Sequence, residues 1–316
     1  MPYSLAYASV PLDRAANLRG NEDWLNQQKS SANARVLVVW RDCNLIKAGE
    51  EPEAVILSGE QARNVLDQTV EKHPPVFLGM QDDAPVFMAK LSHLTEEDAL
   101  NVSGSSADQA AFVDLRSVGP LISQDTGSLL AMARAMAYWH RRHMFCGACG
   151  ADTASETGGH VRRCTNSNCN LEHFPRTDPA VIMLVTTTME SVEHCLLGRQ
   201  ASWAARTYSS LAGFVEPGES LETAVLREVL EESGIKATNA KYQASQPWPF
   251  PSSLMLGFRA RALTHEIDTS SNELEDARWF SHAEIIDIAE NNRDDHKLSR
   301  SDSIASWLIE DWIKNP

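Results

Sequence analysis

The stretch GFVEPGESLETAVLREVLEESGI, residues 213–235, carries the clearest structural pattern in the C-terminal half of the chain. Apolar residues recur at helical spacing from about Leu221 to Ser233, and Gly234 is well placed as a left-handed helix stop. The apolar side chains expected to pack towards a core are Leu221, Ala224, Val225 and Leu230. The stretch therefore predicts a glycine- and proline-containing loop, residues 212–219, followed by an amphipathic helix.

Three glutamates of this helix are expected to lie close together. Glu228, Glu231 and Glu232 stand at positions i, i+3 and i+4, so they share one helix face. Like charges at this spacing repel one another unless a cation lies between them, and hard oxygen ligands suit Mg²⁺ or Mn²⁺. A solvated acidic helix face is the alternative interpretation of the glutamates taken alone.

Four of the six cysteines form a cluster in the sequence, with the pattern Cys146-x2-Cys149, fourteen residues, Cys164-x4-Cys169. Each short pair directs two sulfurs at one point, which favours a tetrahedral zinc ion held by four thiolates. Because four protein ligands leave no open coordination position, this zinc is predicted to be structural.

Basic side chains flank the cysteine cluster, and they are expected to form either a local basic face for a nucleic-acid chain or a solvated rim. They are His140, Arg141, Arg142, His143, Arg162 and Arg163. The two isolated cysteines, Cys43 and Cys195, are interpreted as buried thiols.

Charge and hydropathy exclude several classes of protein. The chain has 28 basic and 43 acidic residues, a net charge of −15, which argues against a general nucleic-acid binder. Residues 177–316 hold 12 basic and 22 acidic residues, which favours a carboxylate-bound metal there. The longest clean apolar run, residues 180–185, is too short to span a membrane, and no export signal is recognised. A cytoplasmic protein is expected.

The order of strand and helix patterns predicts a layered α/β architecture. Strand patterns occupy residues 35–40, 54–58, 75–80 and 84–91, and a helical pattern over 127–142 leads to the cysteines. After Pro179, strand patterns alternate with helical ones: strands at 180–187, 194–200, 253–263 and 277–280, and helices at 282–290 and 303–313. This arrangement indicates a mixed N-terminal domain and a layered α/β or α+β C-terminal domain.

Residues 213–235 resemble the Nudix box, GX5EX7REUXEEXGU with U an aliphatic residue, at every specified position. The resemblance implies an α/β/α sandwich and a divalent-metal-dependent hydrolase of compounds that join a nucleoside diphosphate to another group. It also implies that Glu228, Glu231 and Glu232 are metal ligands. In the same way, Glu219 is expected to support the loop and the metal site, and Arg227 to hold the glutamates by ion pairing.

A second string, SQPWPFPSS at residues 245–253, resembles the signature of the NADH pyrophosphatase branch of this family. Its three prolines restrict the backbone and are expected to present Trp248 and Phe250 as a rigid aromatic platform. The resemblance extends, more weakly before Tyr138, to a three-part layout: an N-terminal Nudix-like mixed domain (1–143), a zinc ribbon (144–175) and a Nudix domain (176–316).

The resemblance also assigns individual residues. It implies that Trp248 and Phe214 sandwich a nicotinamide, that Gln246 contacts the substrate and that Phe174 contacts a base. Glu273 is expected to complete the metal site, and Ala305 is a candidate for a backbone contact. Glu231, Glu232 and Glu273 are the expected catalytic carboxylates. Of these, Glu231 and Glu273 are the candidates for the general base.

The predicted reaction is hydrolysis of the pyrophosphate of NADH, and less efficiently of NAD⁺, to nicotinamide mononucleotide and AMP. Cleavage of the same bond in NAD-capped RNA, which leaves a 5′-monophosphate, is an alternative main role. A non-catalytic nucleotide-sensing or nucleic-acid-binding module is the alternative from another class, and the intact set of glutamates argues against it. The resemblance further implies a homodimer.

Overall fold

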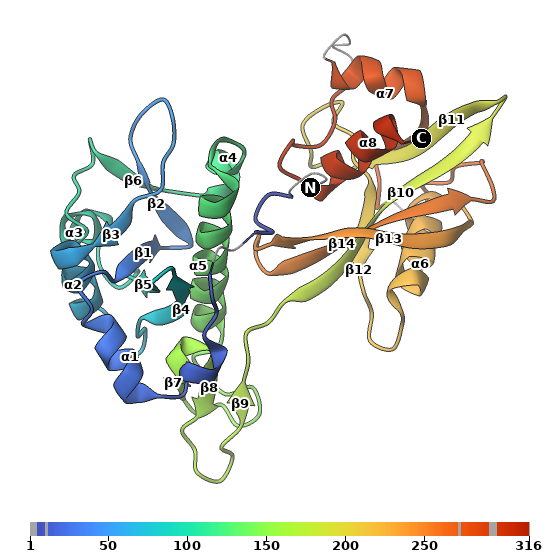
Figure 1. The fold of residues 1–316 in the computed structure, drawn as a ribbon. Helices are drawn as coiled ribbons and strands as arrows, with labels where there is room; N and C mark the ends of the chain where they lie inside the picture. Colours follow the sequence, from blue (N-terminus) through green and yellow to red (C-terminus); the bar gives the residue numbers. More distant parts are fainter. Residues whose placement is uncertain (1–4, 10–11, 271–272, 291–295, 316) are drawn as a thin grey trace. The chain divides into compact units, whose positions relative to one another are not determined.

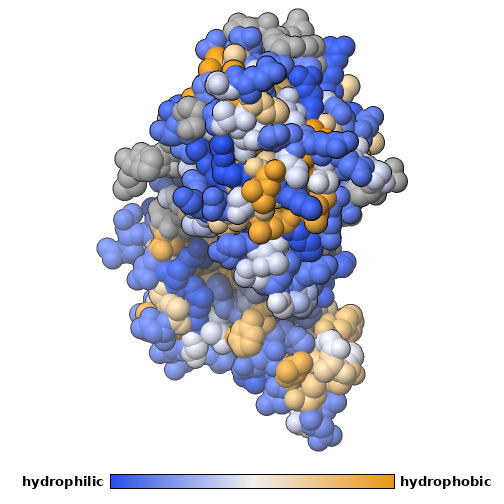
Figure 2. All heavy atoms as spheres, turned by 90° about the vertical axis from the view of Figure 1, so that its right-hand side faces the viewer, coloured by the Kyte–Doolittle hydropathy of each residue, from blue (hydrophilic) through white to orange (hydrophobic). Residues whose placement is uncertain are grey.

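The computed structural model describes residues 5–9, 12–270, 273–290 and 296–315, and it divides into two compact units (Figure 1). One unit contains residues 9–177 together with 249–252, and the other contains the N-terminal residues up to 8, residues 178–248 and residues from 253 onward. No helix among the described residues is long and apolar enough to cross a membrane. The face shown in Figure 2 is mainly hydrophilic, with small separated apolar groups.

The C-terminal unit is organised around one mixed sheet. Its strands, in spatial order, are β13 (Ala237–Trp248), β14 (Ser253–Ala262), β10 (Asp178–Met189), β11 (Val192–Arg199) and β15 (Asp276–Ser281), and β12 (Leu211–Phe214) also pairs with β10. Strand β10 runs parallel to β14 and antiparallel to β11 and β12. Its continuous apolar run is buried on both faces, as its central position requires.

Helices cover both faces of this sheet and produce the predicted α/β/α sandwich. Helix α6 (Leu221–Ser233) packs on the face that carries Val181 and Met183. Helices α7 (His282–Ala289) and α8 (Ile304–Lys314) pack on the opposite face, which carries Ile182 and Leu184. This alternation along β10 follows from the two-residue period of a strand. The fold prediction is thereby confirmed.

The boundaries of α6 were predicted correctly, but its buried face was predicted with one error. Leu230 is 47% exposed, whereas its neighbour Val229 is completely buried. Gly234 has φ 71°, as expected of a left-handed helix stop, and its N–H bonds to the carbonyl of Leu230. The Leu230 backbone therefore belongs to the helix end, while its side chain faces away from the core.

The N-terminal unit contains a second sheet with the same topology. Its strands, in spatial order, are β4 (Val76–Gln81), β5 (Ala84–Lys90), β1 (Arg35–Trp40), β2 (Cys43–Lys47) and β6 (Ala110–Val113), and β3 (Ile56–Ser58) also pairs with β1. Strand β1 is parallel to β5 and antiparallel to β2 and β3, as β10 is to its three neighbours. The helices of this unit are α1 (Glu22–Lys29), α2 (Gly59–Asp67), α3 (Glu96–Val102), α4 (Leu115–Val118) and α5 (Gln124–Arg142).

The repeated topology places α2 where α6 stands in the other unit. Helix α2 follows β3 directly, whereas six residues, 215–220, separate β12 from α6. The sequence of α2, GEQARNVLD, has no glutamate stripe. The N-terminal sheet therefore repeats the scaffold of the C-terminal one without the loop and the carboxylates.

A small three-stranded sheet follows in the chain, made of β7 (Thr153–Glu156), β8 (Val161–Cys164) and β9 (Glu172–His173). Of the four clustered cysteines, Cys164 ends β8, and the other three lie outside these strands. The four sulfurs all lie within 4.8 Å of one another. The Sγ atoms of Cys146 and Cys169 are 3.8 Å apart, and those of Cys149 and Cys164 are 3.4 Å apart. Four thiolates at about 2.3 Å from a common zinc ion have a similar spacing. The cluster fits zinc.

The prediction of an exposed basic rim beside the ribbon is wrong for Arg162 and His140, which are buried. Arg162 is 1% exposed and His140 is 3% exposed. The Arg162 guanidinium donates to the carbonyls of His143 and Thr153, and its Nη1 lies 3.0 Å from Nδ1 of His140. Arg163 is paired with two glutamates, Glu156 and Glu172. These side chains stabilise the ribbon, so they do not form a free cationic surface.

We expect the purified protein to contain about one zinc ion per chain, resistant to mild chelation. Replacing Cys149 by serine removes one ligand and should lower both the zinc content and the unfolding midpoint, the latter by roughly 5 °C. Elemental analysis and thermal denaturation measure the two effects. The control is Cys43→Ser, which removes a half-buried thiol outside the cluster. Freshly purified protein without stoichiometric zinc would contradict the assignment.

Candidate metal and substrate site

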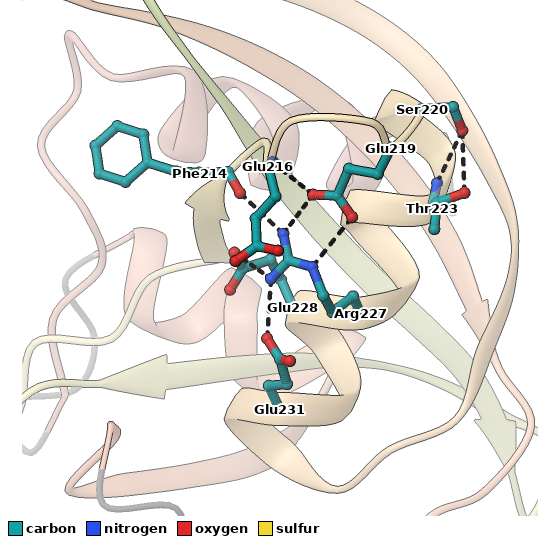
Figure 3. A network of polar contacts seen from close by, with 8 residues as sticks. All are labelled: Phe214, Glu216, Glu219, Ser220, Thr223, Arg227, Glu228 and Glu231. Carbon is teal, nitrogen blue, oxygen red and sulfur yellow. Dashed lines mark hydrogen bonds and ion pairs between the residues drawn. The ribbon is translucent and has the colours of Figure 1, made fainter.

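The loop between β12 and α6 holds the start of the helix in place (Figure 3). The Ser220 hydroxyl accepts a hydrogen bond from the N–H of Thr223 and caps α6. One oxygen of Glu219 accepts a hydrogen bond from the N–H of Glu216 at 2.7 Å, which closes the loop. The loop is therefore ordered by hydrogen bonds of its own side chains.

Arg227 connects this loop to the carboxylates of the helix. Its Nε and Nη2 donate to the two oxygens of Glu219, at 3.1 and 2.6 Å. Its Nη1 lies 2.9 Å from carboxylate oxygens of both Glu228 and Glu231, and Nη2 also donates to the carbonyl of Phe214. One guanidinium thus binds three carboxylates and the end of β12, which matches the ion-pairing role implied by the resemblance (Figure 3).

Gly213 leaves the space that the Glu228 carboxylate occupies. A Cβ atom at position 213 would lie 1.8 to 2.1 Å from the carboxyl atoms of Glu228, far inside any contact distance. Glu228 itself is only 8% exposed. A side chain at position 213 would therefore displace the Glu228 carboxylate, which packs directly against the glycine backbone.

Glu232 is the most deeply buried of the three glutamates, at 5% exposed. Burial, together with the negative charges of Glu228 and Glu273, raises the pKa of Glu232 to about 8, although a hydrogen bond from the backbone of Ala212 opposes the shift. Burial also raises the pKa of Glu228, although Arg227 opposes that shift. The Oε2 atom of Glu232 is buried and has no hydrogen-bond partner.

These observations fit a divalent cation. A buried carboxylate oxygen without a partner, next to other carboxylates whose charges disfavour ionisation, is stabilised when a cation binds. Glu273, which is exposed, contributes to the raised pKa of both Glu228 and Glu232, so its charge acts on this site. Within the part of the chain that the structure describes, only the four clustered cysteines have potential metal-ligand atoms that all lie close together. The carboxylates of Glu228 and Glu231 instead bind Arg227.

The two predicted stacking residues lie on one face of the sheet. Ala212 and Ala244 contact the core beneath α7 and α8, and residues two or four positions further along a strand share that face. Phe214 on β12 and Trp248 on β13 are therefore on the same side, with β10 and β14 between their strands. Three strand spacings separate β12 from β13 by roughly 14 Å, and Trp248 lies a further two residues along β13 from the position in register with Phe214. Phe214 is 61% exposed, and Figure 3 shows its ring directed away from Arg227.

Gln246 and Ala305 are buried, which gives both a structural role. The Gln246 side chain is completely buried; its amide donates to the carbonyls of Ala6 and Asp302 and accepts from the N–H of Ile304. Ala305 is 3% exposed within α8. The contacts of Gln246 and Ala305 with a substrate stay predictions. The hydrogen bonds by which Gln246 joins three backbone segments were not indicated by any sequence pattern.

The two other aromatic residues with a predicted role, Phe174 and Phe250, belong to the N-terminal unit. Phe174 is 61% exposed there, and its contact with a base stays a prediction. Phe250 is 7% exposed, so it is not part of an open platform as expected. The guanidinium carbons of Arg116 and Arg134 lie 4.9 and 5.0 Å from the centre of the Phe250 ring and cover it.

Comparisons with known proteins agree with this architecture. Three family models match the chain: the NADH pyrophosphatase-like rudimentary NUDIX domain over residues 33–139, the NADH pyrophosphatase zinc ribbon domain over 141–174 and the NUDIX domain over 176–301. The repeated sheet topology is the structural counterpart of the first match.

Curated relatives match most of the chain. The NAD-capped RNA hydrolase NUDT12 of Homo sapiens is 36% identical and covers 98% of this chain and 74% of its own length. The NAD-capped RNA hydrolase NudC of Mycobacterium bovis is 33% identical over 86% of this chain and 87% of its own, and NudC of Stutzerimonas stutzeri is 39% identical over 74% and 75%. The chain therefore belongs to the Nudix hydrolase family, in the branch that joins a rudimentary NUDIX domain and a zinc ribbon to a NUDIX domain.

Proposed function

We propose that this protein hydrolyses the pyrophosphate of NADH, and less efficiently of NAD⁺, to nicotinamide mononucleotide and AMP. The proposal rests mainly on the positions of the last two residues of β12, Gly213 and Phe214. Gly213 adjoins the buried carboxylates of α6, and the next residue, Phe214, presents an exposed aromatic ring on the other face of the sheet. A substrate that joins a flat base to a pyrophosphate suits this pair of neighbouring surfaces.

Different residues of the site serve the pyrophosphate and the aromatic part of the substrate. Glu228, Glu231, Glu232 and Glu273 would hold Mg²⁺ or Mn²⁺, which when bound offsets the negative charge of the pyrophosphate. Arg227 keeps Glu228 and Glu231 in position. Water attacks one phosphorus, the bond to the bridging oxygen breaks, and Glu231 or Glu273 accepts the proton. Trp248 and Phe214 stack on the nicotinamide.

Hydrolysis of NAD-capped RNA is the second candidate. It is favoured by the names of three curated relatives, which are called NAD-capped RNA hydrolases. The bond cleaved is the same, so the site described above serves both substrates. The net charge of −15 disfavours extended contacts with an RNA chain. The proposed catalytic cation is Mg²⁺ or Mn²⁺, and the protein is proposed to act as a homodimer in the cytoplasm.

Incubation of the protein with NADH and Mg²⁺ should release AMP and reduced nicotinamide mononucleotide in equal amounts, as measured by liquid chromatography. Glu231→Gln and Glu232→Gln should each lower kcat about 100-fold or more, because stabilisation of the developing charge is lost. The matched control is Glu222→Gln, the same change at an exposed position in the first turn of α6. Near-normal rates in both correctly folded site variants would contradict the assignment.

Trp248→Ala should lower kcat/KM for NADH roughly 5- to 150-fold, the range expected for loss of base stacking. Hydrolysis of ADP-ribose, which has no nicotinamide, should fall less, so the ratio of the two kcat/KM values is compressed. Trp203→Ala, at a partly exposed tryptophan in the loop after β11, is the control. An equal fall for both substrates would show that Trp248 only supports its loop.

A further inference from the structure

The first described residues of the chain are part of the C-terminal unit, although residues 9–177 separate them from it in sequence. Tyr7 is 2% exposed and has φ 64°, in the left-handed region that a bulky side chain rarely adopts. Local backbone preference therefore does not explain its conformation. Contacts with the rest of the unit must hold it there.

The Tyr7 side chain is fixed at both its ring and its hydroxyl. Its ring meets the Trp248 indole edge to face, with centroids 6.1 Å apart and planes at 61°. Its hydroxyl donates to Oδ2 of Asp302 at 2.9 Å. Asp302 is 7% exposed and is itself bound by two nitrogens of Arg300, at 2.9 and 2.8 Å. The ring is thus held against Trp248 by a charge-assisted chain of hydrogen bonds.

The backbone beside Tyr7 is tied to the strand that carries Trp248. Gln246 lies two residues before Trp248 on the same face of β13. Its buried amide donates to the carbonyls of Ala6 and Asp302. The N-terminal segment, strand β13 and the start of α8 therefore meet at one buried amide, two residues from Trp248.

We propose that Tyr7 is a positioning residue that sets the orientation of the Trp248 indole for stacking on the nicotinamide. This inference rests on the proposed function of Trp248. Tyr7 is buried, so it acts through Trp248 and does not touch the substrate. It thereby contributes to the preference for substrates that carry a nicotinamide over those that end in a bare ribose.

A core residue with no positioning role has a different signature. Its replacement lowers stability and slows hydrolysis of NADH and ADP-ribose to the same extent. A positioning residue changes the ratio of the two kcat/KM values, and its effect depends on the presence of Trp248. The ratio and its dependence on Trp248 therefore separate the two roles.

The experiment compares Tyr7→Leu, which keeps an apolar side chain but removes the ring, with Tyr7→Phe, which removes only the hydroxyl. Tyr7→Leu should lower the NADH to ADP-ribose ratio roughly 2- to 10-fold, the range expected for loss of an aromatic pair, and Tyr7→Phe about 2-fold. The matched control is Tyr242→Leu, because Tyr242 also lies on β13 in an edge-to-face pair, with Phe258, but is 54% exposed. This control should leave the ratio unchanged.

The same substitutions in the Trp248→Ala background complete the test. There, Tyr7→Leu should cause no further fall in the ratio. An unchanged ratio in the folded Tyr7 variants, or an equal additional fall without Trp248, would overturn the proposal. If Tyr7→Leu does not fold, the ratio for Tyr7→Phe decides. A wild-type protein with no preference for NADH would overturn the proposed function as well, whereas a preference that survives both Tyr7 substitutions would overturn only the role of Tyr7.

Discussion

The structure of the site depends on one guanidinium. Arg227 binds Glu219 in the loop, Glu228 and Glu231 on the helix, and the carbonyl of Phe214 at the end of β12. Without this cation, the carboxylates would repel one another at close range in a partly buried setting. With it, the loop, the helix and the strand have a fixed geometry. Arg227 thus holds Glu228 and Glu231, although their oxygens are not yet gathered as a group of metal ligands in the described part of the chain.

Regular patterns and close spacings in the sequence predicted much of the fold and part of the site. Helix α6 and its glycine stop followed from a 3.6-residue period, and the cysteine cluster followed from two short spacings. Contacts between distant segments were not accessible in this way. Tyr7 reaches Trp248 from the other end of the chain, and Gln246 acts through backbone groups that have no sequence signature. The exposure of Leu230 was missed because a period fixes the buried face only within about one residue.

Comparison of the two sheets separates the residues that only build the scaffold from those that form the candidate site. Both place a helix after a short strand that pairs with the central strand, yet α2 follows β3 without a loop and α6 follows β12 after six residues. The loop provides Glu219, which binds Arg227, and Gly213 provides the space for Glu228. The scaffold alone therefore does not create the site. The inserted loop and the glutamates do.

We infer that the buried carboxylates of α6 form a site for a divalent cation. Titration with Mn²⁺, followed by electron paramagnetic resonance of the free ion, tests this claim without any assumption about the substrate. The wild-type protein should bind Mn²⁺, and Glu232→Gln should weaken that binding at least about 10-fold, because the carboxylate with the unpartnered buried oxygen loses its charge. Equal affinity in the wild type and in a folded Glu232→Gln variant would contradict the account.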